Sequence, residues 1–174
     1  MIMETEKGLL YDFTGNGKGK TSAALGVVLR ALGRGWKVAV LQFMKGERET
    51  GERLFFQQYF PQILFEGCGL GRTCRPGDHA GAAREGWKKA AALLADFDGE
   101  LLVLDELNVA LAHQYLDLPE VVEALKNRRP ELNVIVTGRN SPPELREIAD
   151  LVSDIAAEKH PYQQGVPARK GLDF

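Results

Sequence analysis

The length, composition and charge of the chain suit a soluble globular protein and exclude several other classes. The chain has 174 residues, of which 44% are hydrophobic and 26% charged, so it can bury a core within one domain of ordinary size. Its 22 basic and 24 acidic residues give a net charge of −2, and no overall positive field attracts nucleic acid or an anionic membrane. We therefore predict a single domain over residues 1–174 that binds neither.

Membrane, secreted and metal-cage proteins are also disfavoured. No apolar stretch is long enough to cross a bilayer, and the first seven residues lack the apolar segment of a signal peptide, so we expect a cytoplasmic protein. Cys68 and Cys74 have five residues between them in a glycine-rich segment, and the three histidines are scattered. Neither spacing matches a zinc or redox site, so we expect ordinary free thiols.

Short apolar runs alternate with helical segments along the chain, which is typical of a parallel sheet covered by helices on both faces. The first predicted strand covers residues 9–13, and the first predicted helix covers residues 20–32 and ends before Gly33. Further strands are predicted at residues 37–43, 63–65, 101–104 and 133–137, with a less apolar one at residues 151–156. Further helices are predicted at residues 79–95, after Leu118, and from Pro142 onward.

Three segments do not fit this alternation. Residues 45–51 and 66–81 are predicted loops, the second because of its many glycines. The tail, residues 159–174, is irregular but keeps Tyr162, Val166, Leu172 and Phe174, so we predict that it docks on the rest of the molecule.

A glycine-rich loop between the first strand and the first helix has the context of a P-loop. It consists of Gly15, Asn16, Gly17, Lys18, Gly19, Lys20 and Thr21. Its backbone amides and the following helix N-terminus favour phosphate, Lys20 would reach the terminal phosphates, and the Thr21 hydroxyl would bind Mg²⁺. Thr14 stands where the full motif has its first glycine, so the loop is a variant.

Two other interpretations of this loop are less consistent with the sequence. A glycine-rich turn without a ligand would not explain why strand, loop, Gly-Lys-Thr and helix all agree. A dinucleotide-binding fold would need G-x-G-x-x-G and an acidic residue after the second strand, whereas that strand ends in Gln42 and Phe43. We therefore predict a P-loop NTPase-like, three-layer α/β fold with a mainly parallel sheet of about six strands.

A pair of carboxylates completes the predicted phosphate site. Asp105 and Glu106 follow the apolar strand at residues 101–104, as in a Walker B motif, where acids beside the P-loop hold Mg²⁺ and its waters. The predicted metal-binding set is therefore Thr21, Asp105 and Glu106. Alternatively, the two acids could only cap the next helix.

Several motifs together closely resemble the ATP:corrinoid adenosyltransferases of cobalamin synthesis and salvage. They occur in the same order from about Tyr11 to Phe174 and are more specific than the P-loop alone. They are the P-loop run, Gln42-Phe43-Met44-Lys45-Gly46, Arg84-Glu85-Gly86-Trp87, Leu104-Asp105-Glu106-Leu107, Val136-Thr137-Gly138-Arg139, Lys159-His160 and Gly165-Val166.

The resemblance implies an enzyme that transfers the 5′-deoxyadenosyl group of ATP to the Co(I) form of a corrinoid and releases triphosphate. It implies Mg²⁺ or Mn²⁺ at the phosphates, a homodimer, an electron donor such as a reduced flavoprotein, and an ATP molecule reversed relative to P-loop kinases. Lys20, Thr21 and Glu106 would then be catalytic. Lys18 and Lys20, the loop amides and Thr21 through the metal ion would hold the triphosphate. Lys45, Arg139 and Lys159 could add to this site.

The corrinoid needs a broad, partly apolar surface, for which the loop at residues 66–81 and the tail are the candidates. Some members of the family carry aromatic residues in this loop that keep the lower axial ligand away from cobalt. This chain has Leu70 and Arg72 there, so it departs from that pattern.

Two other functions remain open from the residues alone. A P-loop kinase or ATPase would act at the γ-phosphate, with Glu106 as a possible base, and would produce ADP. A nucleotide-dependent binding module would bind ATP without turnover, even with reduced corrinoid present.

Overall fold

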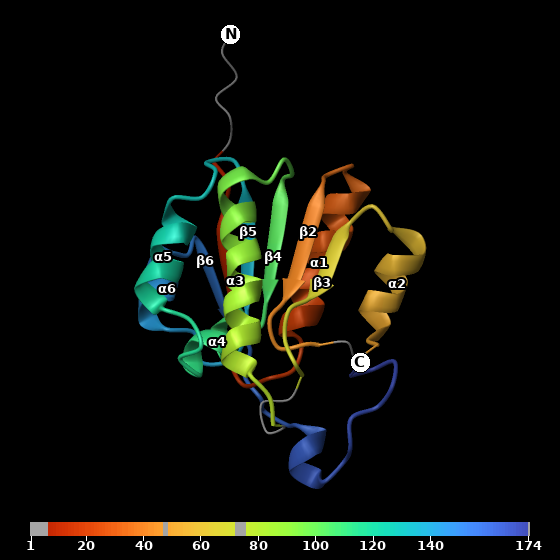
Figure 1. The fold of residues 1–174 in the computed structure, drawn as a ribbon. Helices are drawn as coiled ribbons and strands as arrows, with labels where there is room; N and C mark the ends of the chain where they lie inside the picture. The colour runs from red at the N-terminus through yellow and green to blue at the C-terminus, as the bar shows by residue number, and fades with distance from the viewer. Residues whose placement is uncertain (1–6, 47–48, 72–75, 174) are drawn as a thin grey trace.

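The fold is built around one six-stranded parallel sheet (Figure 1). A computed structural model of the chain describes residues 7–46, 49–71 and 76–173. The strand order is β3-β2-β4-β5-β1-β6, and each neighbouring pair is parallel. The strands are β1 Leu10–Thr14, β2 Val38–Gln42, β3 Leu64–Gly67, β4 Leu101–Asp105, β5 Asn133–Thr137 and β6 Leu151–Asp154.

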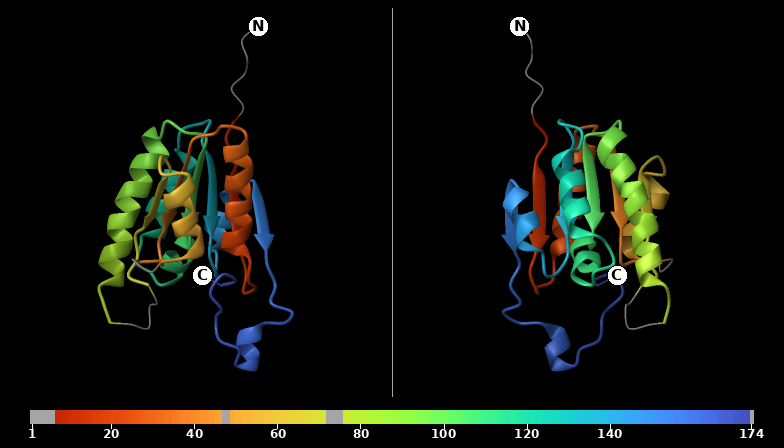
Figure 2. Two further views of the ribbon diagram at one scale, coloured as in Figure 1. Left: turned by 90° about the vertical axis from the view of Figure 1, so that its right-hand side faces the viewer. Right: turned by 60° about the vertical axis from the view of Figure 1, so that its left-hand side comes forward.

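Helices cover both faces of the sheet. They are α1 Lys20–Gly33, α2 Gly51–Tyr59, α3 His79–Asp96, α4 Leu107–Ala112, α5 Leu118–Lys126 and α6 Pro143–Ile148, followed by a 3-10 turn at Pro161–Gln164. Helices α1 and α2 bury apolar side chains against one face, and α3 to α6 against the other. Figure 2 shows α3 and α1 on opposite sides of the sheet. The predicted three-layer α/β fold is confirmed.

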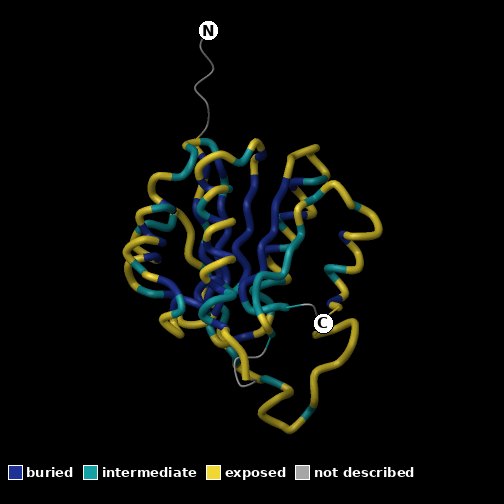
Figure 3. The backbone as a smooth tube through the Cα atoms, viewed as in Figure 1, coloured by how far each residue is buried: buried dark blue, intermediate teal, exposed yellow. Residues whose placement is uncertain are grey.

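The strands contribute alternate residues to two separate cores. In β4, Leu101 and Val103 pack with α1, whereas Leu102 and Leu104 pack on the opposite face. All five residues of β2 and β4 are buried, as dark blue segments in the middle of Figure 3. Strands buried on both faces have no polar alternation, which is why they were recognisable as short apolar runs.

The predicted strands and helices are present, with small shifts at their ends, but two further helices were missed. Helix α2 was missed because only Phe56 of its nine residues is buried, so its apolar pattern is weak. Helix α4 follows directly on β4 after a left-handed residue, Glu106, at φ 60°. Its apolar residues continue those of the strand, so the sequence does not mark the boundary.

The expectation that the tail docks through its apolar side chains was wrong for two of them. Tyr162 is 80% exposed and Leu172 is 71% exposed. The tail instead extends beyond the sheet and turns back toward its edge, as the blue segment in Figures 1 and 2. Phe174 lies outside the described residues.

The parallel arrangement brings the segments that follow the six strands to one edge of the sheet. Because all strands run in the same direction, the segments that follow β1, β2, β3, β4, β5 and β6 leave the sheet at the same edge, the lower one in Figure 1. Ligands of open α/β sheets bind at this carboxyl edge. Strand β5 lies between β1, which leads into the P-loop, and β4, which carries the carboxylates.

Candidate functional site

A cavity of about 1780 Å³ opens at the carboxyl edge of the sheet. Its wall comes from the P-loop, the segments after β2 and β3, the start of α2, α4, the segment after β5, and the tail. Residues of the predicted phosphate site that line it are Gly17, Lys18, Gly19, Lys20, Thr21, Lys45, Glu106 and Arg139. The fold thus gathers residues separated by more than a hundred positions in the chain.

The P-loop takes its turns at two glycines, and this explains the variant motif. Gly15 has φ 97° and Gly19 has φ 121°, a region that side chains rarely adopt. Thr14 is instead the last, fully buried residue of β1, so an extended backbone suffices there. A Cβ atom on Gly17 would lie 2.4 Å from the backbone oxygen of Ala156, so the segment after β6 also requires glycine in this loop.

Lys20 folds back over its own loop. Its Nζ donates hydrogen bonds to the backbone oxygens of Gly15, at 2.8 Å, and Gly17, at 2.7 Å. Burial, with the nearby Arg139 cation, lowers the pKa of Lys20. These carbonyl contacts hold the ammonium group above the loop, where phosphate oxygens could replace the carbonyls as acceptors.

Thr21 and Asp105 are in direct contact, although 84 residues separate them. The Thr21 hydroxyl donates to Asp105 Oδ1 at 2.8 Å, and the Thr137 hydroxyl donates to the same oxygen at 2.7 Å. The other oxygen, Oδ2, accepts from Gln42 Nε2 at 2.9 Å. Asp105 is therefore a fully hydrogen-bonded, 1% exposed carboxylate that three other groups hold in place.

Glu106 differs from its neighbour because it faces the cavity with few partners. Its backbone N–H donates to Thr137 Oγ1 at 2.9 Å. Burial, together with the charge of Asp105, raises the pKa of Glu106 to about 7. Glu106 is the first residue before α4, but within the described residues its side chain makes no capping hydrogen bond. The alternative of a purely capping role for these acids is therefore not supported by Glu106.

The described donors suit a magnesium ion that is shared with phosphates. They comprise one hydroxyl, from Thr21, and two carboxylates, from Asp105 and Glu106. Among residues 7–46, 49–71 and 76–173, no group of three or more His, Cys, Asp or Glu residues could hold a metal ion. Mg²⁺ typically takes one or two carboxylates and completes its shell with water and substrate phosphates, so the donors fit such an ion.

The other residues predicted to bind the triphosphate differ in how they lie relative to Thr21, Asp105 and Glu106. Lys45 Nζ lies 3.3 Å from Asp105 Oδ2, and Arg139 lines the cavity. Lys18 is paired with Asp173 of the tail. Asn16 and Lys159 are exposed and are absent from the cavity wall, so the structure does not bring them to the centre.

A buried polar cluster behind the P-loop was missed at the sequence level. Asn108 Nδ2 donates to Asp12 Oδ1 at 2.8 Å, and the Ser141 hydroxyl donates to the other Asp12 oxygen. Burial raises the pKa of Asp12, although both hydrogen bonds act in the opposite direction. The cluster ties β1, α4 and the Arg139 segment together. Asn108 stands two residues after Glu106, and this polar residue in an apolar run was the available signal.

The cavity wall also has an apolar part. Met44, Leu70, Val109, Tyr162 and Leu172 line it, together with His113 and His160. These residues come from the segments after β2 and β3, from α4 and from the tail. Arg72 and Cys74, which the sequence analysis singled out, lie outside the described residues.

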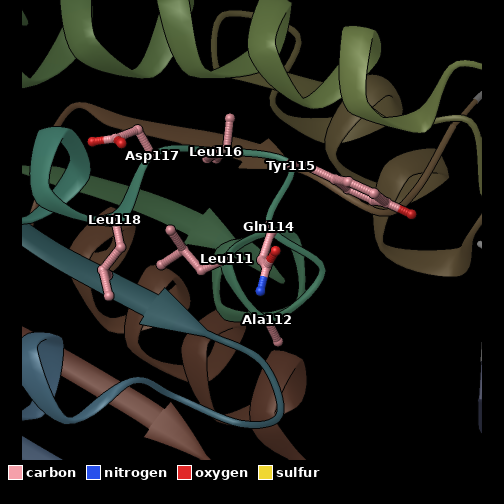
Figure 4. A pocket seen from close by; sticks show the side chains of 7 residues that line it. All are labelled: Leu111, Ala112, Gln114, Tyr115, Leu116, Asp117 and Leu118. Atoms are coloured by element: carbon pink, nitrogen blue, oxygen red, sulfur yellow. The ribbon is translucent and has the colours of Figure 1, made fainter.

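A second, shallower cavity of about 610 Å³ lies between α4 and α5. Figure 4 shows its lining, in which Asp117 and Tyr115 extend in opposite directions in the view. The Asp117 carboxylate accepts from the Glu120 backbone N–H at 2.9 Å and so caps α5. The carboxylate already has this structural role, and we assign no ligand to the cavity.

Comparison with known sequences points to one family. Residues 6–174 match the family described as ATP:corrinoid adenosyltransferase BtuR/CobO/CobP. A corrinoid adenosyltransferase of Pseudomonas aeruginosa is 44% identical over 97% of this chain and 85% of its own length. A corrinoid adenosyltransferase of Escherichia coli K12 is 42% identical over 98% and 88%, and the corrinoid adenosyltransferase CobA of Salmonella typhimurium is 39% identical over the same shares.

Comparison with solved structures agrees on the fold. The KaiC-like protein PH0186 from Pyrococcus horikoshii superposes with a TM-score of 0.50 at 16% identity, covering 88% of this chain and 74% of that protein. At this identity the likeness concerns the fold alone. In the described part of the chain, no helix has the length and apolar character needed to span a membrane.

Proposed function

Because this chain belongs to the ATP:corrinoid adenosyltransferase family and transfers the 5′-deoxyadenosyl group of ATP to a corrinoid, we propose that the reaction takes place in the cavity at the carboxyl edge of the sheet. One observation carries this assignment. Thr21 of the P-loop is hydrogen-bonded to Asp105 at 2.8 Å, beside Lys20 and the cavity-facing Glu106.

The triphosphate would lie along the P-loop. The amides of residues 15–21, the Lys20 ammonium and the start of α1 provide a positive environment for it, and Lys45 and Arg139 add charge from the segments after β2 and β5. These groups stabilise the negative charge that develops on the triphosphate as it leaves. Electrostatic stabilisation of a leaving group is worth most where the donors are fixed in advance.

For this reaction the protein must position the two substrates, and it need not supply a general base. The cobalt–C5′ bond forms with the electron pair of Co(I), and the bond between C5′ and the triphosphate oxygen breaks, with its electrons leaving on the oxygen. No proton has to be removed from the nucleophile, so no general base is needed. The residues must instead align C5′ with the corrinoid, and alignment of this kind can lower a barrier by several kcal/mol.

We propose that Thr21, Asp105 and Glu106 hold Mg²⁺ or Mn²⁺ with the phosphates. The ion would neutralise charge on the departing triphosphate. Asp105 already accepts three hydrogen bonds, so we expect it to act through water, whereas Glu106 is the carboxylate with free capacity. Glu106 must then be ionised, and the cations of Lys20, Lys45 and Arg139 favour that form.

The corrinoid would occupy the apolar part of the wall, near Leu70 and the tail. We also propose three finer features: a homodimer, a reduced flavoprotein or similar electron donor for cobalt, and a cytoplasmic location. We further propose that residues 1–174 form one domain. A sedimentation experiment on the purified protein tests the dimer directly.

The central test is anaerobic incubation of the purified protein with Mg-ATP and chemically reduced cobalamin. Loss of the Co(I) spectrum, formation of light-sensitive adenosylcobalamin and release of intact triphosphate are the expected results. Production of ADP would instead indicate chemistry at the γ-phosphate, and ATP binding without turnover would indicate a binding module. Variants Lys20→Ala and Arg139→Ala then test whether this cavity is the place of reaction.

A further inference from the structure

Lys45 is held between two carboxylates that belong to different elements. Its Nζ lies 2.8 Å from Oε1 of Glu52, in the first turn of α2, and 3.3 Å from Oδ2 of Asp105, at the end of β4. The side chains are 25%, 17% and 1% exposed, for Lys45, Glu52 and Asp105 respectively. Solvent screening of such an arrangement is weak compared with that of surface ion pairs.

The charges of this group depend on one another. Burial alone would lower the pKa of Lys45, but Asp105 and Glu52 outweigh it and raise the pKa. Burial alone would likewise raise the pKa of Glu52, but Lys45 outweighs it and lowers the pKa. Gln42 Nε2 lies between the two carboxylates, 2.9 Å from Asp105 Oδ2 and 3.5 Å from Glu52 Oε1. The contacts of its Nζ with Glu52 and Asp105 therefore orient the Lys45 ammonium group.

We propose that Glu52 is a positioning residue that holds Lys45 in place for the triphosphate, an inference that rests on the proposed function of the cavity. An ammonium group has three N–H donors in a fixed tetrahedral arrangement. Glu52 accepts one of them at 2.8 Å, and the charge of Asp105, 3.3 Å away, attracts the same ammonium group, so that the two carboxylates orient its remaining donors. A lysine on a four-carbon stem would otherwise lose rotamer freedom on binding the triphosphate. Glu52 does not touch the triphosphate itself and acts through Lys45.

This role differs from a contribution of Glu52 to helix α2. An acidic residue in the first turn also stabilises a helix through its dipole, and such an effect would not depend on Lys45. It also differs from competition, in which Glu52 would keep Lys45 away from the triphosphate. The three possibilities give different results in a double-mutant cycle.

The test measures binding of inorganic triphosphate with Mg²⁺ by calorimetry, without corrinoid, so that it is independent of adenosyl transfer. Glu52→Gln should weaken binding about 5- to 20-fold, and Lys45→Ala should weaken it at least as much. In the Lys45→Ala background, Glu52 is a carboxylate near an anion without its partner. Adding Glu52→Gln there should leave binding unchanged or improve it.

Two control variants test whether the effect depends on the length of the Glu52 side chain and on its place in the cavity. Glu52→Asp keeps the acid at the start of α2 but shortens the side chain by one methylene, and it should weaken binding as Glu52→Gln does while unfolding within about 3 °C of the wild type. Glu66→Gln removes the carboxylate of the Lys89 pair on β3, outside the cavity wall, and should leave binding unchanged.

Tighter or unchanged binding in Glu52→Gln would overturn the proposal, as would equal weakening by Glu52→Gln in both backgrounds. Adenosyl transfer is measured separately. A wild-type protein that binds triphosphate but forms no adenosylcobalamin would contradict the proposed reaction, while the cycle would still decide the role of Glu52. A wild-type protein that does not bind triphosphate would overturn both.

Discussion

At the residue scale, some polar groups of the site already have their hydrogen-bond partners within the protein, and others can exchange theirs for a ligand. Asp105 accepts three hydrogen bonds and has little left to offer. Lys20 uses two backbone carbonyls as acceptors, which an incoming phosphate can replace. Glu106 is partly buried, and burial together with the charge of Asp105 raises its pKa to about 7 although three cations lie nearby.

The first prediction at this scale concerns the P-loop. Lys20→Ala and Thr21→Ala should each lower adenosyl transfer at least about 100-fold, because each removes a contact to the triphosphate or to its metal ion. The rate of adenosylcobalamin formation under anaerobic conditions is the measurement. Arg30→Ala, at an exposed position in the last turn of the same helix outside the cavity wall, serves as the control and should change the rate much less. Near-normal rates in either variant would contradict the phosphate site.

The second prediction concerns the pH dependence that Glu106 imposes. Its carboxyl has an ordinary pKa of 4.5 when unfolded and about 7 when folded, so between these values the folded state binds more protons. Stability attributable to this group therefore falls as pH rises from about 4.5 to about 7 and stays low above. Glu106→Gln removes the buried charge and should raise the Tm of the ligand-free protein.

We expect an increase of roughly 3–6 °C at pH 8, corresponding to on the order of 1–2 kcal/mol. The gain should shrink toward pH 5, where the native carboxyl is already neutral. Thermal unfolding in EDTA over this pH range is the measurement. A gain that is the same at pH 5 and pH 8 would show that protonation of Glu106 is not its cause.

At the scale of elements, polar contacts that cross between elements hold the functional segments in register. Asn108 joins α4 to β1 through Asp12 and also lies 3.4 Å from the backbone oxygen of Gly138. Gly138 has φ 135°, and a Cβ atom there would lie 2.8 Å from that of Asn108. The segment that carries Arg139 thus packs directly on the start of the helix that follows Glu106.

Asn108→Asp tests this packing. It would place a second carboxylate against buried Asp12, and like charges in a dry environment repel strongly. We expect a loss of about 2–4 kcal/mol in the free energy of unfolding at pH 7, measured by urea denaturation. The loss should be smaller at pH 5, where the pair can share a proton. Gln57→Glu, at an exposed position on α2, is the control and should change stability by less than about 0.5 kcal/mol.

The segment after β3 provides another test at this scale. Leu70 lines the cavity and is 51% exposed, which suits a contact with an apolar ligand. Leu70→Ala should weaken corrinoid binding about 5- to 10-fold while changing ATP binding less than about twofold. Leu54→Ala, at a 43% exposed leucine on α2 outside the cavity wall, should alter neither. Equal effects on both substrates would count against a corrinoid at this segment.

At the scale of the whole molecule, the sheet is a rigid platform whose carboxyl edge holds the cavity and the tail closes one side of it. Few tail side chains are buried, yet Tyr162, Leu172 and Asp173 reach the cavity wall, and Asp173 pairs with Lys18 of the P-loop. Segments with little buried surface contribute little to global stability. The tail should therefore contribute more to substrate binding than to the stability of the fold.

Removal of residues 160–174 should lower the Tm by less than about 3 °C but raise the KM for cobalamin about tenfold or more. The KM for ATP should change less than about threefold, since the residues of the phosphate centre remain. Steady-state kinetics and thermal unfolding of the shortened chain are the measurements. A large loss of stability would mean that the tail belongs to the fold after all.

A point variant complements the truncation. Leu172→Ala should reproduce part of the rise in the cobalamin KM. Leu29→Ala, at a 63% exposed leucine on α1 away from the cavity, should not.

The sequence by itself determined the features whose signals are local. Apolar runs predicted the parallel strands, because strands buried on both faces lack polar alternation, and the P-loop was evident because its glycines, lysine and threonine are consecutive. The carboxylates Asp105 and Glu106 were found because they directly follow such a strand. The order of motifs along the whole chain also led to the correct family.

Only the tertiary structure decided which distant residues meet. Glu52 reaches Lys45 and Asp105, and Asn108 reaches Asp12, because a parallel sheet brings the ends of strands far apart in sequence to one edge. It also decided that Glu106 takes a left-handed conformation at the boundary between β4 and α4. In the tail, it decided that Tyr162 and Leu172 are exposed. Contacts of this kind depend on the packing of whole elements, and no local pattern of residue types encodes them.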